Sequence, residues 1–231
     1  MSPRSQEIKQ SGLFGFLAQP DAGTKAGVVI LPTIFGVNAF ARGFAETLAR
    51  AGLAAAVWDH YEGLPLTTDY EESRARGRKL NDAFMHAKVK AWTDYLFSEL
   101  KLTSVGAIGF CMGGRYVLMA AAKDKRLKAC VAAYPSIEVP NLPNQDEDAI
   151  ALAGTIGCPA LVVQPGHDHV ATPATYAALK ETMFKRPAPT IWQYYPDGEH
   201  GFMHRDQPPA NPAASVIASP QLVGFLQGCL L

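Results

Sequence analysis

Residues 105–119 read Val-Gly-Ala-Ile-Gly-Phe-Cys-Met-Gly-Gly-Arg-Tyr-Val-Leu-Met. A short apolar run leads into a glycine-rich turn, and a helix-compatible segment follows the turn. The pattern G-x-C-x-G around Cys111 matches a nucleophile elbow, with cysteine in the position that serine more often occupies. Glycines flank the nucleophile because larger side chains would collide with the strand and the helix that the turn joins. The stretch therefore predicts a strand, a sharp turn and a helix, with the sulfur of Cys111 raised above the edge of a sheet.

The rest of the chain alternates apolar strands with helices, which is typical of a parallel sheet covered on both sides. The expected strands are residues 13–18, 27–31, 53–58, 127–134, 159–164 and 190–195. Helices are expected over residues 39–51, 173–184 and 220–230, with one or two more over 72–100. We expect residues 137–155 to form a surface excursion and the proline-containing segment 206–216 to resist regular structure. The prediction is an α/β fold, with a mostly parallel central sheet flanked by helices on both faces, in a single domain over residues 1–231.

The composition of the chain argues against several classes of function. The chain has 231 residues, 48% of them hydrophobic and 18% charged, and its formal net charge is +0, so no general attraction to nucleic acid or to anionic membranes is expected. Residues 1–9 are polar, unlike a signal peptide, and we count no apolar run near the ~20 residues of a membrane span. The cysteines lack the paired spacing of a metal site, which favours reduced thiols in a cytoplasmic protein without bound metal. No feature of the sequence sets the oligomeric state, and we take a monomer as the working expectation.

Three reactive side chains follow three different predicted strands. Cys111 follows the elbow strand, Asp168 the strand 159–164 and His200 the strand 190–195. Parallel strands bring their carboxyl ends to one edge of the sheet, and the order nucleophile, acid, histidine is that of α/β-hydrolases. A histidine can take the thiol proton, and a carboxylate behind the ring fixes its tautomer. We therefore predict a catalytic triad of Cys111, His200 and Asp168.

Attack of a thiolate on a carbonyl creates an oxyanion, which requires hydrogen-bond donors already aimed at it. The backbone N–H of Met112, at the start of the helix after the elbow, is one expected donor. The second is the N–H of Ile34, in the loop that follows the strand 27–31.

With these residues, the sequence resembles the dienelactone hydrolase (carboxymethylenebutenolidase) family of α/β-hydrolases over nearly the whole chain. The matching pieces are residues 34–38, Ile-Phe-Gly-Val-Asn; 109–114, Gly-Phe-Cys-Met-Gly-Gly; 166–168, Gly-His-Asp; and 199–202, Glu-His-Gly-Phe. The resemblance implies a Cys-His-Asp triad that hydrolyses small cyclic esters without a metal or an organic cofactor.

The sequence departs from that family at two places. Well-studied members carry a glutamate just before the Ile-Phe-Gly loop that helps to activate the cysteine, whereas this chain has Thr33. Two arginines hold the substrate carboxylate in the family. Arg74 falls near the first, and the second position is His204, with Arg205 beside it. We therefore expect an altered carboxylate clamp and a natural substrate other than dienelactone.

Aromatic residues after predicted strands are candidates for pocket walls: Phe35, Tyr61, Tyr134 and Phe202. Arg74 belongs to a basic run, so it is either a ligand contact or part of a solvated helix face. His167 and His169 beside Asp168 look like a fragment of a metal site, but no further cluster completes a coordination shell.

Two other functions use the same residues. The scaffold could be a non-catalytic small-molecule or redox-sensing module with a modifiable Cys111, which Thr33 in place of glutamate favours. It could also transfer an acyl group to an acceptor other than water. The leading prediction is a hydrolase of a small lactone or ester, with that small molecule as its partner.

Overall fold

One eight-stranded sheet organises the computed structural model, which describes residues 3–204 and 211–231. The strands are β1 (Arg4–Gln10), β2 (Leu13–Gln19), β3 (Ala26–Leu31), β4 (Ala54–Trp58), β5 (Ser104–Phe110), β6 (Cys130–Ala133), β7 (Ala160–His167) and β8 (Thr190–Glu199). The helices are α1 (Ala39–Arg50), α2 (Tyr70–Gly77), α3 (Asp82–Ser98), α4 (Met112–Lys123), α5 (Ala149–Ala153), α6 (Pro173–Phe184) and α7 (Pro212–Leu230). The strand order is β1-β2-β4-β3-β5-β6-β7-β8.

The strands from β4 through β3 to β8 are parallel, while β1 and β2 join the β4 side in antiparallel pairing. Every residue of β3, β4 and β6 is buried, which explains their unbroken apolar sequences: a parallel strand covered on both faces has no solvent side. This arrangement brings the carboxyl ends of β3, β5, β6, β7 and β8 to one edge of the sheet.

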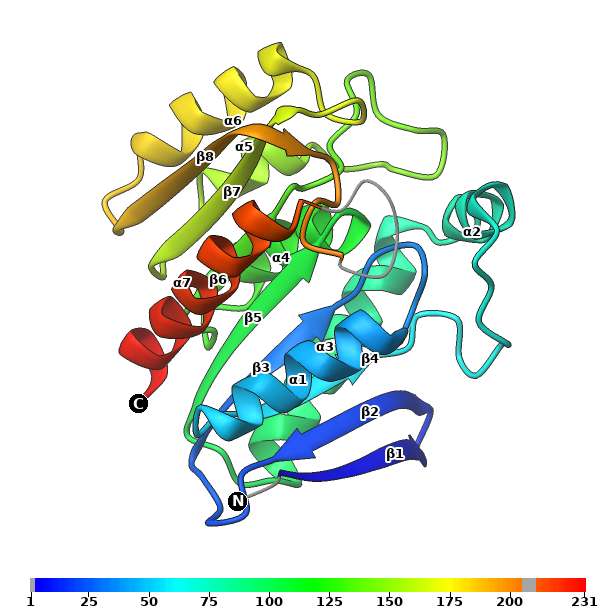
Figure 1. Cartoon of the computed structure of the whole chain (residues 1–231), viewed down its shortest axis with the longest axis vertical. Coiled ribbons are helices and arrows are strands. Elements are labelled where there is room, and N and C mark those ends of the chain that lie inside the picture. The colour runs from blue at the N-terminus through cyan, green and yellow to red at the C-terminus, as the bar shows by residue number, and fades with distance from the viewer. Residues whose placement is uncertain (1–2, 205–210) are drawn as a thin grey trace.

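Helices cover both faces of the sheet (Figure 1). On one face α1 and α7 pack against the strands, and their buried residues belong to the same core cluster as Phe110 and Tyr134. On the other face α3, α4 and α6 contribute Trp92, Leu118 and Leu179 to a second cluster. The α/β-hydrolase architecture expected from the sequence is therefore present.

The structure also corrects parts of the predicted element map. Strand β1 was not expected; its residues are mostly exposed, so its sequence lacks an apolar signal, and it is ordered by pairing with β2. A short helix, α5, interrupts the expected excursion 137–155. Helix α7 begins at Pro212, well before the expected residue 220, because proline is tolerated in the first turn and Asn211 caps the helix. The prediction that 206–216 lacks regular structure is thus wrong for its last part, and 206–210 lie outside the described residues.

Helix α7 is also long and apolar enough, by length and composition, to cross a membrane. The count of apolar runs in the sequence missed this. Such a helix is weak evidence for a membrane span, since Leu222, Leu226 and Leu230 of α7 are buried in the core cluster that it shares with α1.

Candidate active site

The turn between β5 and α4 holds Cys111 in a strained conformation, with φ 55° and ψ −119°. A Cβ atom on Gly109 would lie 1.9 Å from the carbonyl oxygen of Gly113, and one on Gly113 would lie 2.0 Å from that of Leu31. No side chain fits at either position, so both glycines are required by close backbone packing. The predicted nucleophile elbow is present, and its strain serves to present a single side chain to the cavity above the sheet.

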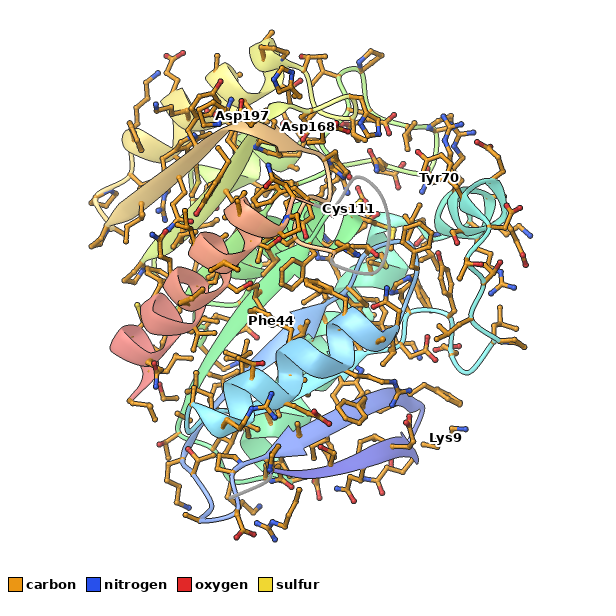
Figure 2. The ribbon with its side chains drawn as sticks, in the orientation of Figure 1. Lys9, Phe44, Tyr70, Cys111, Asp168 and Asp197 are labelled. Carbon is orange, nitrogen blue, oxygen red and sulfur yellow. The ribbon has the colours of Figure 1, made fainter. Side chains whose placement is uncertain are left out.

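The acid and the histidine meet at the ends of the two neighbouring strands. His200, which follows β8, places Nδ1 3.0 Å and 2.9 Å from the two carboxylate oxygens of Asp168, which follows β7. Figure 2 labels Asp168 and Cys111, which lie on the same side of the sheet beyond the ends of their strands. The ring edge opposite Asp168 faces the elbow.

Asp168 is held by more than the histidine. Its Oδ1 accepts hydrogen bonds from the backbone N–H groups of Val170 and Ala171 at 2.8 and 2.9 Å, and the hydroxyl of Tyr176 donates to Oδ2 at 2.8 Å. Burial raises the pKa of Asp168, but these hydrogen bonds and the charge of His200 outweigh it and lower the pKa below its ordinary value. The carboxylate is therefore ionised and fixed in orientation.

Between Cys111 and His200 lies the hydroxyl of Ser136. Its Oγ is 3.2 Å from the sulfur of Cys111 and 3.4 Å from Nε2 of His200. The three side chains form a continuous chain of polar contacts that ends on Asp168.

Charge within this group favours the thiolate. Burial raises the pKa of Cys111, but the charge and hydrogen bond of His200, followed by the Ser136 hydroxyl and the Met112 N–H, lower it below its ordinary value. Burial lowers the pKa of His200, but the Cys111 thiolate and Asp168 raise it to about 10. The two groups titrate as a pair, and each favours the charged form of the other.

Met112 and Ile34, whose N–H groups the sequence predicts as oxyanion donors, both line the cavity that contains Cys111. Met112 begins helix α4, where the first N–H groups have no acceptor within the helix and the helix dipole favours negative charge. Ile34 lines the cavity, and within the described part of the chain its N–H has no hydrogen-bond acceptor. Both groups can donate to an oxyanion formed beside Cys111.

Thr33 and Tyr61 shape the loop that carries Ile34. The hydroxyl of Thr33 accepts a hydrogen bond from the N–H of Phe35 at 3.2 Å, so it stabilises the turn and is not aimed at the thiol. The hydroxyl of Tyr61 donates to the carbonyl oxygen of Ile34 at 2.7 Å. These contacts fix the peptide that follows Ile34, and with it the loop that carries the Ile34 N–H.

Above these groups lies a cavity of about 790 Å³. Its floor consists of the reactive groups and the donor loop, among them Cys111, His200, Ser136, Thr33, Phe35 and Ile34. One wall comes from α2 and the residue after it, with Arg74, Arg78 and Tyr70, and the facing wall comes from the excursion, with Ile137, Val139 and Leu142. The cavity thus has a basic wall and a largely apolar wall.

A buried ion pair fixes the excursion. Arg115 of α4 bonds to Asp82 at 2.7 Å with both side chains about 1% exposed. Asp82 also accepts the N–H groups of Asp146 and Glu147, each at 2.9 Å, and Arg115 donates to the carbonyl oxygen of Glu147 at 2.8 Å. The apolar wall is therefore anchored to the same helix that starts at the elbow.

The residues expected to hold a substrate carboxylate differ in their charge. Arg74 lines the cavity and lies 3.7 Å from Glu71. His204 also lines the cavity and stacks on Phe40 at 4.3 Å, but burial and the charge of His200 lower its pKa to about 4. A neutral His204 cannot replace the positive charge of an arginine. Arg205 lies outside the described residues.

Three of the predicted pocket walls lie elsewhere. Tyr134 and Phe202 are each 0% exposed and pack on each other at 5.8 Å, beneath His200, because they belong to the core cluster under the cavity. Tyr61 is buried behind Ile34 and supports its carbonyl group. These three residues shape the site from below, and Phe35 alone of the four predicted aromatic walls lines the cavity.

Sequence reasoning missed Ser136, Tyr176 and Arg78. Ser136 comes three residues after the end of β6, a position at the carboxyl edge of the sheet that could have identified it. Arg78 lies four residues after Arg74, on the same side of α2. Among the residues that the structure describes, no group of three or more His, Cys, Asp or Glu side chains is placed to hold a metal ion.

Several known proteins are similar to this chain over most of its length. The family model described as "Dienelactone hydrolase family" matches residues 13–230. A carboxymethylenebutenolidase of Rhodococcus opacus is 26% identical over 205 residues, covering 86% of this chain and 78% of the relative. One of Pseudomonas putida is 26% identical over 226 residues, covering 92% and 90%. The crystal structure of a putative dienelactone hydrolase from Klebsiella pneumoniae has a TM-score of 0.86 at 20% identity, covering 98% and 99%, which supports the same fold.

Proposed function

The chain belongs to the dienelactone hydrolase family and acts as a hydrolase on ester or lactone bonds, and from this premise we propose that Cys111, His200 and Asp168 perform the reaction through a thioester. The observation that carries the proposal is the position of His200. Its Nδ1 meets Asp168 at 2.9 Å, while its Nε2 contacts the hydroxyl that touches the sulfur of Cys111. A buried imidazole held in this way can exchange protons only on the side of the nucleophile.

In the proposed reaction the Cys111 thiolate attacks the carbonyl carbon of the substrate. The N–H groups of Met112 and Ile34 stabilise the oxyanion, and the loss of one such donor typically costs about 3–4 kcal/mol of barrier. His200 then gives its proton to the leaving oxygen, which in a lactone stays attached to the acyl group. In the second half, His200 accepts a proton from water, the hydroxide resolves the thioester, and the thiolate is restored.

The cavity supports a small acyl substrate with one anionic and one apolar part. A volume of about 790 Å³ exceeds the needs of a five-membered lactone, and pockets of about 300–1,000 Å³ suit larger ligands. Arg74 and Arg78 offer positive charge on one wall, while Ile137, Val139 and Leu142 offer apolar contact on the other. Because His204 is neutral, we propose a natural substrate other than dienelactone.

A direct test uses chromogenic short-chain esters and small lactones with wild-type protein and Cys111→Ala. We expect steady turnover by the wild type, an acyl adduct on Cys111 by mass spectrometry, and a loss of at least about 10⁴-fold in Cys111→Ala. Cys229→Ala, at a half-buried thiol on α7 away from the cavity, should keep wild-type activity.

Other outcomes would lead to other functions. Stoichiometric labelling of Cys111 without turnover would indicate a sensing module, and product formed only with an added alcohol or amine would indicate acyl transfer. A dienelactone rate typical of a dedicated enzyme would refute the substrate proposal. The cytoplasmic location and the monomeric state remain predictions.

A further inference from the structure

We infer that Ser136 is a catalytic residue that bridges the sulfur of Cys111 and Nε2 of His200 and stabilises their charged pair. The inference rests on the proposed Cys-His-Asp function and extends the triad of this chain to four side chains. The hydroxyl of Ser136 touches both reacting groups, at 3.2 Å from the sulfur and 3.4 Å from the imidazole nitrogen.

The backbone places this hydroxyl independently of its side-chain contacts. The N–H of Ser136 donates to the carbonyl oxygen of Cys111 at 3.0 Å, which ties residue 136 to the elbow itself. Pro135 packs so closely on the elbow helix that a Cβ on Gly114 would lie 2.8 Å from its Cα. Tyr134, with φ 38°, donates its N–H to Val163 at 2.9 Å and turns the chain toward the cavity.

Among the described residues, Ser136 supplies the side-chain hydroxyl that contacts the thiol. Thr33 accepts the N–H of Phe35, and Tyr176 donates to Asp168 on the far side of the imidazole. The Tyr134 hydroxyl is buried and has no partner within the described residues. Ser136 also lines the cavity, so its hydroxyl lies where the substrate meets the sulfur.

Ser136 serves the charged pair without changing its own protonation. Its hydroxyl donates to the thiolate of Cys111, and its oxygen accepts a hydrogen bond from the Nε2–H of the His200 imidazolium. The serine therefore stabilises both charges and is unchanged at the end of the turnover.

The test combines the variants Ser136→Ala and Ser136→Thr with wild-type protein. Loss of a hydrogen bond to a charged group should raise the thiol pKa of Cys111 by about one unit and slow single-turnover acylation about 10- to 100-fold in Ser136→Ala. Ser136→Thr keeps the hydroxyl and should restore the rate to within about 3-fold. Ser98→Ala, on the exposed side of α3, is the matched control and should behave as wild type.

A second measurement follows the thiolate directly. The thiol midpoint of Cys111, read from ultraviolet absorbance against pH, should be higher in Ser136→Ala than in wild type and should return toward the wild-type value in Ser136→Thr. Ser136→Gly removes the same hydroxyl, so either folded variant decides the outcome. Unchanged acylation and an unchanged thiol midpoint in such a variant overturn the inference. In that case inactive Cys111→Ala and His200→Gln would leave the triad standing, whereas an active Cys111→Ala would refute the proposed function itself.

Discussion

Three buried histidines in this chain differ in the direction of their pKa shifts. His60, His200 and His204 are 1%, 7% and 6% exposed, yet the pKa falls to about 3 at His60 and about 4 at His204 while it rises to about 10 at His200. Neither ring nitrogen of His60 has a partner within the described residues, and it packs between Trp58 and Tyr61. His200 contacts a carboxylate and faces a thiol. Burial alone thus makes a histidine neutral, and only paired negative charge keeps one protonated.

The charged side chains around His200 carry a cost in folding stability that the uncharged surroundings of His60 avoid. Desolvation opposes the ionised form of Asp168, His200 and Cys111 alike, and buried ion pairs often stabilise a fold less than apolar side chains of similar size. An arrangement of this kind at the end of three strands is typical of catalysis. A substitution that removes the charge beside His200 should therefore change the reaction rate, whereas a substitution at His60 should change the stability of the fold.

The largest effect is expected where the charge of His200 is supported. Asp168→Asn keeps the shape but removes the negative charge, so the imidazolium is lost and the thiol pKa rises. We expect kcat/KM for a short ester to fall about 10³- to 10⁴-fold. Asp197→Asn, at an exposed carboxylate in β8 labelled in Figure 2, is the control and should retain full activity. A decrease of less than 10-fold in kcat/KM for Asp168→Asn would show that His200 does not depend on the charge of Asp168.

His60 should affect stability and not catalysis. Because its folded pKa of about 3 lies below the unfolded value of about 6.5, the unfolded state binds the extra proton between these pH values. Stability is then lost as pH falls from 6.5 toward 3. His60→Phe should lose about 2 kcal/mol less unfolding free energy than wild type between pH 7 and pH 5, as measured by urea unfolding.

The control for that experiment is Ser98→Ala, at an exposed position of α3, which keeps His60 and should keep the wild-type pH dependence of unfolding. Equal losses in wild type and His60→Phe would mean that His60 titrates in the folded protein as it does in the unfolded chain.

The smallest effect is expected at Tyr176, which supports Asp168 from behind. Tyr176→Phe removes one of the donors to the carboxylate but leaves the N–H groups of Val170 and Ala171 in place. A decrease of about 5- to 10-fold in kcat/KM follows from the loss of one charged hydrogen bond. Tyr194→Phe, at an exposed tyrosine of β8, should have no effect. If the two variants behave alike, the Tyr176 hydroxyl has no part in orienting the acid.

The sequence was sufficient to predict the parts of the site set by topology. Cys111, Asp168 and His200 each follow an apolar strand, and parallel strands bring such positions together whatever the loops do. The glycines around Cys111 predicted the elbow, because close backbone contacts at these positions leave no room for a side chain. The α/β fold followed from the same alternation of strands and helices.

The remainder depends on loop geometry and on packing, neither of which leaves a periodic signal. Ser136 reaches the thiol only because Tyr134 adopts a positive φ and the next residues fold back on the elbow. Tyr134 and Phe202 follow strands just as Phe35 does, yet they turn inward to the core. Thr33 stands out in the sequence as a departure from the family, and in the structure its hydroxyl accepts a hydrogen bond within its own loop.

The most direct test of the account titrates the thiolate of Cys111 in the free enzyme. The ultraviolet absorbance of wild type minus that of Cys111→Ala, followed against pH, reports this single group. Our account predicts a midpoint below the ordinary value of about 8.5, because His200 is protonated beside the sulfur. A midpoint at or above that value would mean a neutral thiol beside a neutral imidazole, and would contradict the charged pair on which the proposed chemistry depends.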